Sequence, residues 1–361
     1  MTSLLSPPVL PKRLLHADVI RAWATLAVVL LHASVLYVDR WQQVPISWWW
    51  IGNIVHSLSR CAVPLFILLS GALLLGNGKV ESLGTFWRKR LGKLLIPGGL
   101  WSIVYLCFCQ SPETAALPWF QQVLGLLAKP AYGHLWFLYM ILGLYMVTPV
   151  LRVAVRYADR ATLRYYLILW FILCQMLPFL TAVLKLPTVY LTNFFNINGL
   201  AGMFILGYFL DTLPLTPHLR RWAAGLAIGG WVSVAVATPL VINPLTGNPS
   251  TVIYDATSPL TLGLSIGIYL LLKSLPNHQL SQQYPWLYRA IGGISGASFT
   301  IYLAHMLPFY GLQSGRWPLW IDTLTMNPLW LIPVLTIGNL LACWGLHQLL
   351  RRSSIGRWIA P

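Results

Sequence analysis

Acidic residues are scarce in this sequence: only 8 of its 361 residues are Asp or Glu, against 24 Lys and Arg. Charged residues make up 9% of the chain, whereas 57% of the residues are hydrophobic. A soluble protein of this size could not cover its surface with so few charges. The scarcity of charge therefore excludes a soluble globular domain and indicates an integral membrane protein.

The few carboxylates also lie outside the centres of the apolar runs. They stand at the ends of these runs or between them, at Asp18, Asp39, Glu81, Glu113, Asp159, Asp211, Asp255 and Asp322. A proton- or sodium-coupled transporter usually carries a carboxylate inside the membrane. This absence argues against such a transporter, although a transporter or flippase for an anionic solute or glycolipid stays open as the alternative function.

Cysteine is scarce as well, with five residues that all fall inside apolar segments. Cysteines in such positions are typical of small core residues rather than of a disulfide framework. Cys107 and Cys109 are two residues apart, so on a helix they face different directions. We therefore predict no metal site and no disulfide.

Long apolar runs make up most of the chain, and each is close to the ~20 residues that span a bilayer as a helix. The ten runs lie at about 19–38, 50–76, 94–111, 135–151, 164–184, 198–213, 222–242, 257–273, 293–312 and 329–350. No linker, repeat or low-complexity segment separates them. We predict an all-α fold, a polytopic bundle of about ten transmembrane helices that forms a single domain over residues 1–361.

The basic residues alternate between the two sides of this predicted bundle. Nineteen of them lie in the N-terminal tail, in every second connection and after the last run, four lie in the other connections, and Arg60 lies inside a run. The positive-inside rule then places both termini in the cytoplasm. The net charge of +16 comes in short clusters between apolar runs, so it predicts membrane topology rather than a nucleic-acid partner.

The first run, RAWATLAVVLLH, opens with Arg21 and closes with His32. Eleven residues are close to three helical turns, so the two side chains share a face and lie about 16 Å apart along the axis. Asp18 precedes Arg21 by three residues and can pair with it locally. Two structural interpretations stay open, an interfacial anchor for Arg21 and a histidine bonded to a neighbouring carbonyl for His32. Ionisable groups inside a membrane are nevertheless candidates for function, because burying them is costly.

The second run carries His56 and Arg60, four residues apart on one helical face. Arg60 falls near the middle of the run, and no carboxylate lies at that depth. It must therefore find backbone carbonyls, water or an anionic ligand. The alternatives are a role toward a ligand or transition state and a role as a structural clamp.

Two later runs hold further polar groups. The segment GHLWFLYMILGLYMVTPVL begins near His134, and SFTIYLAHMLPF holds Ser298, Tyr302 and His305 on one face. Each of these residues is more often structural when it occurs alone. Several histidines and an arginine together inside apolar helices indicate a functional site instead.

The chain resembles the acyltransferase family 3 of integral membrane acyltransferases. The resemblance rests on the pair in RAWATLAVVLLH, on SRCAVPLFILLSGALLL, on the basic FWRKRLGKLLIP, on HLWFLYMILGLYMVTPVL and on SFTIYLAH, which cover nearly the whole chain in order. Within that family the likeness is to bacterial O-acetyltransferases that modify surface polysaccharides, of the enterobacterial-common-antigen type. An appended hydrolase-like domain, which some members carry, has no counterpart in this sequence.

The resemblance implies transfer of an acetyl or another short acyl group from cytoplasmic acyl-CoA to a sugar hydroxyl. The expected donor is acetyl-CoA, and the expected acceptor is a carbohydrate or glycolipid at the inner membrane of a bacterium, among membrane lipids; a homodimer is left open. It also implies that Arg21 and His32 are the signature pair and that Arg60 belongs to the site.

The residues themselves agree with this chemistry. A neutral imidazole at His32 can act as general base or accept the acyl group first, and Arg60 can stabilise a tetrahedral oxyanion. His305 is the further catalytic candidate. Guanidinium groups bind phosphates strongly, so Arg21, Arg88, Arg90 and Lys93 are candidates for binding the phosphates of acyl-CoA. Positive-inside topology by itself explains most of the cluster at Arg88–Lys93.

Overall fold

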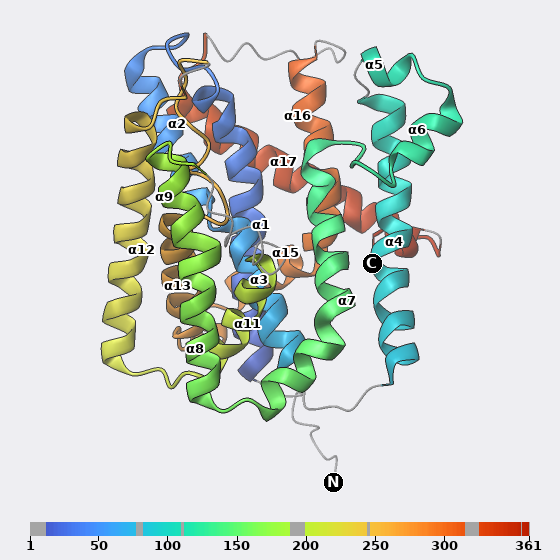
Figure 1. Cartoon of the computed structure of the whole chain (residues 1–361). Coiled ribbons are helices and arrows are strands. Elements are labelled where there is room, and N and C mark those ends of the chain that lie inside the picture. Colours follow the sequence, from blue (N-terminus) through green and yellow to red (C-terminus); the bar gives the residue numbers. More distant parts are fainter. Residues whose placement is uncertain are drawn as a thin grey trace.

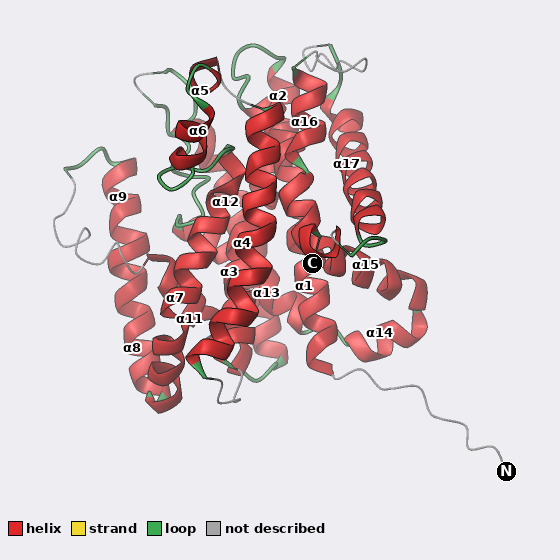
Figure 2. Cartoon of the chain, turned by 90° about the vertical axis from the view of Figure 1, so that its right-hand side faces the viewer, coloured by secondary structure: helices red, strands yellow, loops and turns green. Residues whose placement is uncertain are grey.

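The computed structural model describes residues 12–76, 82–109, 112–187, 199–243, 246–314, 325–354 and 356–360. Its first half contains α1 (Lys12–Val38), α2 (Ile46–Ser59), α3 (Ala62–Leu75), α4 (Leu83–Phe108), α5 (Pro112–Ala115), α6 (Trp119–Gly125), the 3₁₀ turn η1 (Gly133–Leu135), α7 (Trp136–Tyr157), α8 (Arg160–Trp170), the π-helical turn η2 (Phe171–Met176) and α9 (Leu177–Val183). Its second half contains α11 (Gly199–Thr212), α12 (Pro217–Ala237), η4 (Thr238–Leu240), α13 (Pro259–Lys273), α14 (Asn277–Gln283), α15 (Pro285–Ala304), α16 (Met306–Gln313), α17 (Pro328–Leu350) and α18 (Gly356–Ile359). The described part of the chain has no β-strand, so the predicted all-α class is confirmed (Figures 1 and 2).

The long helices run roughly parallel to one another and form a bundle (Figure 1). In the described residues, seven helices are long and apolar enough to cross a bilayer, and counting each of two bent helix pairs as one span raises the number to nine. Helix α11 lies at a predicted run but has 14 residues, fewer than the ~20 that cross a bilayer in a straight helix. The chain is an integral membrane protein, and the count of ten spans stays a prediction.

Local sequence signals begin several of these helices. Asp159 caps α8 by accepting a hydrogen bond from the amide of Thr162 at 2.8 Å, and its pKa is lowered by that contact and by the Thr162 hydroxyl. Thr216 caps α12 in the same way, and a proline follows it at the first helical position. Such caps satisfy amide groups that the first turn of a helix leaves unpaired.

Helix α4 begins earlier than the apolar run at about 94–111 predicts. Its cap is Ser82, whose hydroxyl accepts from the amide of Thr85 at 3.3 Å. The basic segment 88–93, expected in a connection, is therefore the first half of a 26-residue helix. Arginine, lysine and leucine are good helix formers, and hydropathy alone does not show that a helix continues past the apolar layer.

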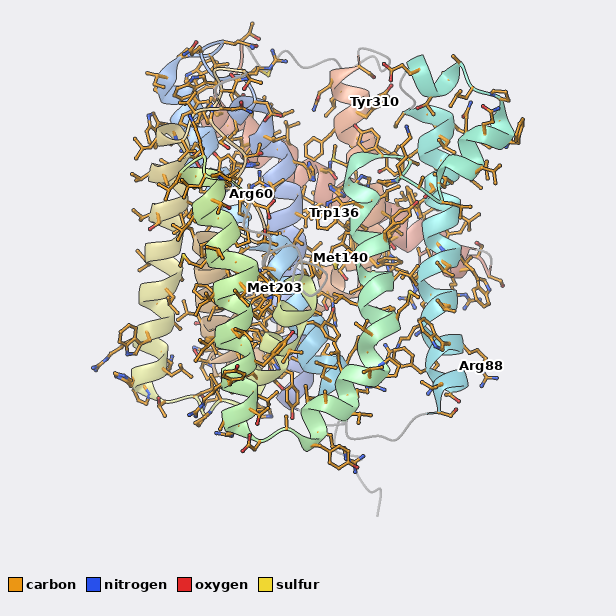
Figure 3. All side chains as sticks on the ribbon, viewed as in Figure 1. Arg60, Arg88, Trp136, Met140, Met203 and Tyr310 are labelled. Atoms are coloured by element: carbon orange, nitrogen blue, oxygen red, sulfur yellow. The ribbon has the colours of Figure 1, made fainter. Side chains whose placement is uncertain are left out.

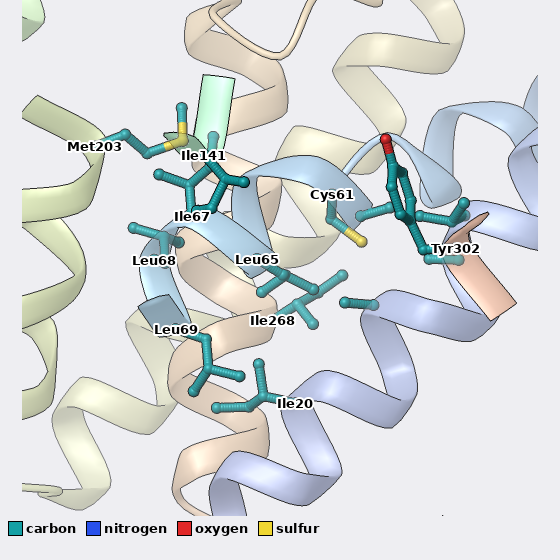
Figure 4. Packing of buried hydrophobic residues seen from close by; sticks show 14 of the residues in the cluster. Ile20, Cys61, Leu65, Ile67, Leu68, Leu69, Ile141, Met203, Ile268 and Tyr302 are labelled. Carbon is teal, nitrogen blue, oxygen red and sulfur yellow. The ribbon is translucent and has the colours of Figure 1, made fainter. Parts of the chain in front are cut away.

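Helix α3 lies at the centre of the bundle and packs against α1, α7, α11 and α13. It is apolar around its whole circumference, as is typical of a fully buried helix. Figure 4 shows Leu65, Leu68 and Leu69 of α3 near Ile20 of α1 and Ile268 of α13. At one point α3 approaches α11 so closely that a Cβ on Gly71 would lie 1.8 Å from the carbonyl oxygen of Phe204.

Two apolar runs that the sequence presents as continuous are interrupted in the structure. The second run divides into α2 and α3 at Arg60 and Cys61. The run near the C-terminus divides into α15 and α16, which meet at His305 with a bend of 43°. Pro64 and Pro308 follow these breaks, and a proline has no amide to donate to the carbonyl four residues earlier and crowds that carbonyl. Arg60 and His305, both predicted as catalytic, thus lie at helix breaks inside the bundle.

The two sides of the bundle are named here from α1. The N-terminal side is the one where α1 begins, and Arg88 near the start of α4 lies there as well (Figure 3). The opposite side carries the connection from α1 to α2, the short helices α5 and α6, and α16 (Figure 1). The cytoplasmic position of the termini stays a prediction.

Candidate active site

His32 and His305 come together although 273 positions separate them in the sequence. Helix α1 packs against α15, and the two imidazole rings lie 5.0 Å apart between centroids. His305 is fully buried, whereas His32 is half-buried. The structure therefore brings two of the predicted catalytic residues into direct contact.

The backbone at the α15–α16 break orients the imidazole of His305. Its Nδ1 lies 2.7 Å from the carbonyl oxygen of Tyr302 and 3.1 Å from that of Ile301. Carbonyl oxygens only accept hydrogen bonds, so Nδ1 carries the proton and donates it. Nε2 is then the basic nitrogen, and it is buried without a hydrogen-bond partner in the described structure. An imidazole held in this way is suited to take a proton from a bound hydroxyl.

Asn339 of α17 stabilises the break between α15 and α16 through a hydrogen bond to its backbone. Its Nδ2 donates to the carbonyl oxygen of His305 at 2.8 Å, and its side chain is buried. Its Oδ1 accepts from the thiol of Cys343 at 3.3 Å. Asn339 thus fixes the turn that carries His305, and sequence reasoning missed it because a lone asparagine in an apolar run has no partner visible in the sequence.

His134 is a third histidine of this cluster. It lies in η1, where α7 begins, and its ring centroid is 5.0 Å from those of His305 and Tyr105. The Tyr302 hydroxyl donates to the backbone carbonyl of His134 at 2.5 Å, which joins α15 to η1. The sequence indicated His134 as a polar residue near the start of an apolar run, but only the fold places it beside His305.

Arg60 lies at the break between α2 and α3, and its partner is an aromatic ring. Its Cζ lies 4.6 Å from the centre of the Tyr254 ring. Its Nε is buried without a hydrogen bond, and its guanidinium forms no ion pair with a described residue. The carboxylates of Asp39 and Asp255 act on it only at a distance. The expectation that Arg60 needs carbonyls, water or an anionic ligand did not include this ring.

Contacts through Tyr254 and His56 link Arg60 to helix α1. The ring of Tyr254 meets that of His56 at 4.7 Å. His56, predicted on the same helical face, contacts the Ser34 hydroxyl at 3.0 Å and the Leu31 carbonyl at 3.2 Å through Nδ1. These contacts extend from Arg60 to the residue that precedes His32.

Arg21 lies at the N-terminal side in a small polar group. One of its terminal nitrogens donates to Asp18 at 3.2 Å and to the hydroxyl of Ser295 at 2.9 Å. Ser295 in turn donates to Asp18 at 2.7 Å. The predicted local pairing of Asp18 with Arg21 is confirmed, and α15 contributes the third member.

The basic residues of α4 do not act as one cluster. Arg88 and Lys93 are exposed, and Arg88 points away from the bundle (Figure 3). Arg90 is half-buried and lies over the ring of Phe86 at 5.8 Å. Two residues along a helix turn the side chain by about 200°, which explains why Arg88 and Arg90 differ.

Arg90 packs against an aromatic ring that it shares with α7. Arg152 of α7 lies over the same ring, Phe86, at 5.2 Å. Of the four residues predicted to bind the donor, Arg21 and Arg90 are therefore half-buried in the bundle, whereas Arg88 and Lys93 lie on the surface.

Within the described ranges, no group of three or more His, Cys, Asp or Glu side chains is arranged to hold a metal ion. The candidate site offers two imidazoles in contact and a guanidinium linked to them through Tyr254 and His56. Such a set can move a proton and stabilise a developing oxyanion.

Comparison with known proteins gives the family. Searches of curated proteins and of solved structures found no match. The family model of the acyltransferase domain (acyltransferase 3) matches residues 15–348, which include every residue of the candidate site. The match agrees with the resemblance seen in the sequence and with the membrane-embedded fold, and this chain belongs to the acyltransferase 3 family of membrane acyltransferases.

Proposed function

We propose that this membrane acyltransferase is an O-acetyltransferase. It moves an acetyl group from acetyl-CoA to a hydroxyl group of a cell-surface or exported polysaccharide, or of its lipid-linked precursor. Its place is the inner membrane of a bacterium, with the N-terminal side of the bundle in the cytoplasm. The likeness to O-acetyltransferases of the enterobacterial-common-antigen type supports the choice of acetyl group and acceptor.

The observation that carries this proposal is the contact between His32 and His305, to which Arg60 is linked through Tyr254 and His56. His305 keeps a buried, unpaired Nε2, and the rings of the two histidines lie 5.0 Å apart. Burying a polar group without a hydrogen bond in an apolar bundle is costly, so such a group indicates a ligand or a function. An acceptor hydroxyl is a suitable partner, because it donates a hydrogen bond to Nε2 and gives up its proton when it reacts.

The proposed reaction needs one proton to move. The imidazole removes the proton of the acceptor hydroxyl while the hydroxyl oxygen forms a bond to the thioester carbonyl carbon. The resulting oxyanion is stabilised by Arg60. The carbon–sulfur bond then breaks, and the CoA thiolate leaves with the proton that the imidazole holds. A route through an acyl-histidine intermediate uses the same groups in two steps.

The donor enters from the N-terminal side in this proposal. Arg21 lies at that end of α1, about 16 Å along the helix from His32. Arg90 is half-buried near the start of α4, on the same side of the bundle. Arginines bind phosphate groups through paired hydrogen bonds, so this pair suits the phosphates of acetyl-CoA, while its pantetheine arm extends toward His32. Arg88 and Lys93 provide a more exposed positive surface for first contact.

The test is label transfer from radioactive acetyl-CoA in membranes that contain the chain as the sole added protein. We expect acid-stable label in a carbohydrate or glycolipid fraction, in proportion to the amount of the chain. The alternative function, a transporter or flippase for an anionic solute, predicts solute uptake into vesicles without any label transfer. That second result would overturn the proposal.

A further inference from the structure

We infer that Tyr254 is a positioning residue for Arg60: its ring holds the guanidinium in place and leaves the N–H groups of that guanidinium available to a reacting oxygen. The inference rests on the proposed oxyanion role of Arg60. It concerns the connection between α12 and α13, which no motif of the sequence singled out.

This connection reaches into the bundle instead of remaining on its surface. Ile253 and Tyr254 are 1% and 3% exposed, and they pack against Val38 of α1 and Val234 of α12. Connections usually lie on the surface, because buried backbone groups must find partners. The burial of Ile253 and Tyr254 indicates that this connection contributes side chains to the interior of the bundle.

Tyr254 is held by contacts at both its hydroxyl and its ring. The hydroxyl donates to Oδ1 of Asn53, and Nδ2 of Asn53 donates to the carbonyl of Ala235 at 2.9 Å. The ring meets that of His56 edge to face at 4.7 Å. Contacts with α2 and α12 therefore fix the Tyr254 ring independently of Arg60.

The contact between Tyr254 and Arg60 is that of a cation over a neutral ring. Burial raises the pKa of Tyr254 to about 12, so its phenol is not ionised at neutral pH and cannot serve as a counter-ion. A cation over an aromatic face gains about 0.5–2 kcal/mol. A carboxylate in the same place would form paired hydrogen bonds with the guanidinium edge.

The kind of partner decides which N–H groups of Arg60 remain available to a ligand. A ring occupies the face of the guanidinium, whereas a carboxylate occupies its edge and competes with a ligand oxygen. An arginine also has many rotamers, and fixing them is costly unless a neighbour holds the side chain. Tyr254 thus orients Arg60 in advance, which is what stabilisation of an oxyanion requires.

The experiment compares Tyr254→Leu with Tyr254→Phe in label transfer from acetyl-CoA. Leucine removes the ring, and phenylalanine keeps the ring but loses the bond to Asn53. We expect Tyr254→Leu to lower kcat by about 10–100-fold, since a displacement of about 1 Å costs up to 100-fold, while KM for acetyl-CoA stays within about twofold of the wild-type value. Tyr254→Phe should keep kcat within about threefold.

Three further variants make the result specific. Ile253→Ala loosens the same connection without contacting Arg60, and we expect it to retain kcat. Arg60→Ala and Arg60→Ala/Tyr254→Leu should have the same kcat, because a positioning residue has no effect once its target is gone. Gel-filtration profile and thermal midpoint in detergent report folding for each variant.

The possible failures differ from one another. Wild-type kcat in Tyr254→Leu beside an inactive Arg60→Ala would overturn the positioning role alone. Equal losses in Tyr254→Leu and Tyr254→Phe would assign the effect to the hydroxyl and overturn the role of the ring. Wild-type kcat in Arg60→Ala would overturn both this inference and the oxyanion role on which it rests.

Discussion

At the scale of residues, the candidate site combines groups that the sequence separates widely. His32 comes from α1, Arg60 from the α2–α3 break and His305 from the α15–α16 break. At both breaks a proline follows within four residues. At His305 the backbone carbonyls of Ile301 and Tyr302 orient the imidazole. The breaks therefore both position the reactive side chains and select the tautomer of one of them.

A first prediction concerns the shape of the Arg60 side chain. Arg60→Lys keeps the positive charge but loses the planar set of donors. We expect kcat to fall by about 10²–10³-fold, the usual cost of losing a donor to an oxyanion, with normal insertion into the membrane. Near-normal turnover in Arg60→Ala would show instead that the residue is a structural clamp.

A second prediction separates binding of the donor from chemistry. Arg21→Ala should raise KM for acetyl-CoA more than it lowers kcat, because Arg21 is far from the reacting carbon. Arg90→Ala should do the same, and by more than Arg88→Ala, because Arg90 is half-buried whereas Arg88 is exposed. Steady-state kinetics in nanodiscs measures these values, and Arg21→Ala needs a folding check because it leaves Asp18 without its cation. Equal, small effects of Arg90→Ala and Arg88→Ala would contradict a phosphate site at Arg90.

At the scale of elements, the position and type of the helices follow from the sequence, but their interruptions do not. The run at about 50–76 is apolar throughout, so hydropathy gives one helix where the structure has α2 and α3. Proline alone does not mark a break either, since Pro97 and Pro149 lie inside the continuous helices α4 and α7. Whether a helix divides depends on the neighbours that satisfy the freed backbone groups, as Asn339 does at His305.

The same limit applies to the site. His32, Arg60 and His305 were predictable because each is a polar residue that an apolar helix does not need. Tyr254 was not predictable, because a tyrosine in a connection is ordinary and its contact with Arg60 spans 194 positions. Contacts of this kind depend on the packing of α2 against α12, which periodicity does not specify.

A third prediction tests the close contact between α3 and α11. A Cβ on Gly207 would lie 1.9 Å from the carbonyl oxygen of Leu68, so the two helices must separate to admit it. Gly207→Ala should lower the free energy of unfolding by about 1–3 kcal/mol, as overpacking does in protein cores. Gly143→Ala on α7 is the control, because no atom lies within 4 Å of its added Cβ. Unfolding in a mixed detergent series compares the two, and equal stability would contradict this packing.

At the scale of the whole molecule, the distribution of basic residues and the proposed routes of the substrates run along the same axis of the bundle. In the sequence, basic residues gather in the segments that lie on the N-terminal side, and Figure 1 shows the connection between α12 and α13 on the opposite side. This polarity suits the proposed function, in which a donor arrives from the cytoplasm and an acceptor lies beyond or within the membrane.

A fourth prediction checks the orientation. In a variant without the five native cysteines, a cysteine at Ser281 in α14 should be labelled only from the cytoplasmic side. A cysteine at Asn248, in the connection between α12 and α13, should be labelled only from the outside. A membrane-impermeant maleimide applied to intact cells and to inverted vesicles distinguishes the two. Labelling of both positions from the same side would refute the predicted topology.

We propose that acyl transfer occurs at the contact between His32 and His305. The most direct test measures transfer of radioactive acetyl groups from acetyl-CoA in native membranes that contain the wild-type chain, His32→Ala or His305→Ala at equal levels. We predict transfer by the wild-type chain and a decrease in kcat of about 10²–10⁴-fold in each variant, the usual contribution of a general acid–base group. Wild-type rates in both variants would contradict the account and place the chemistry elsewhere in the bundle.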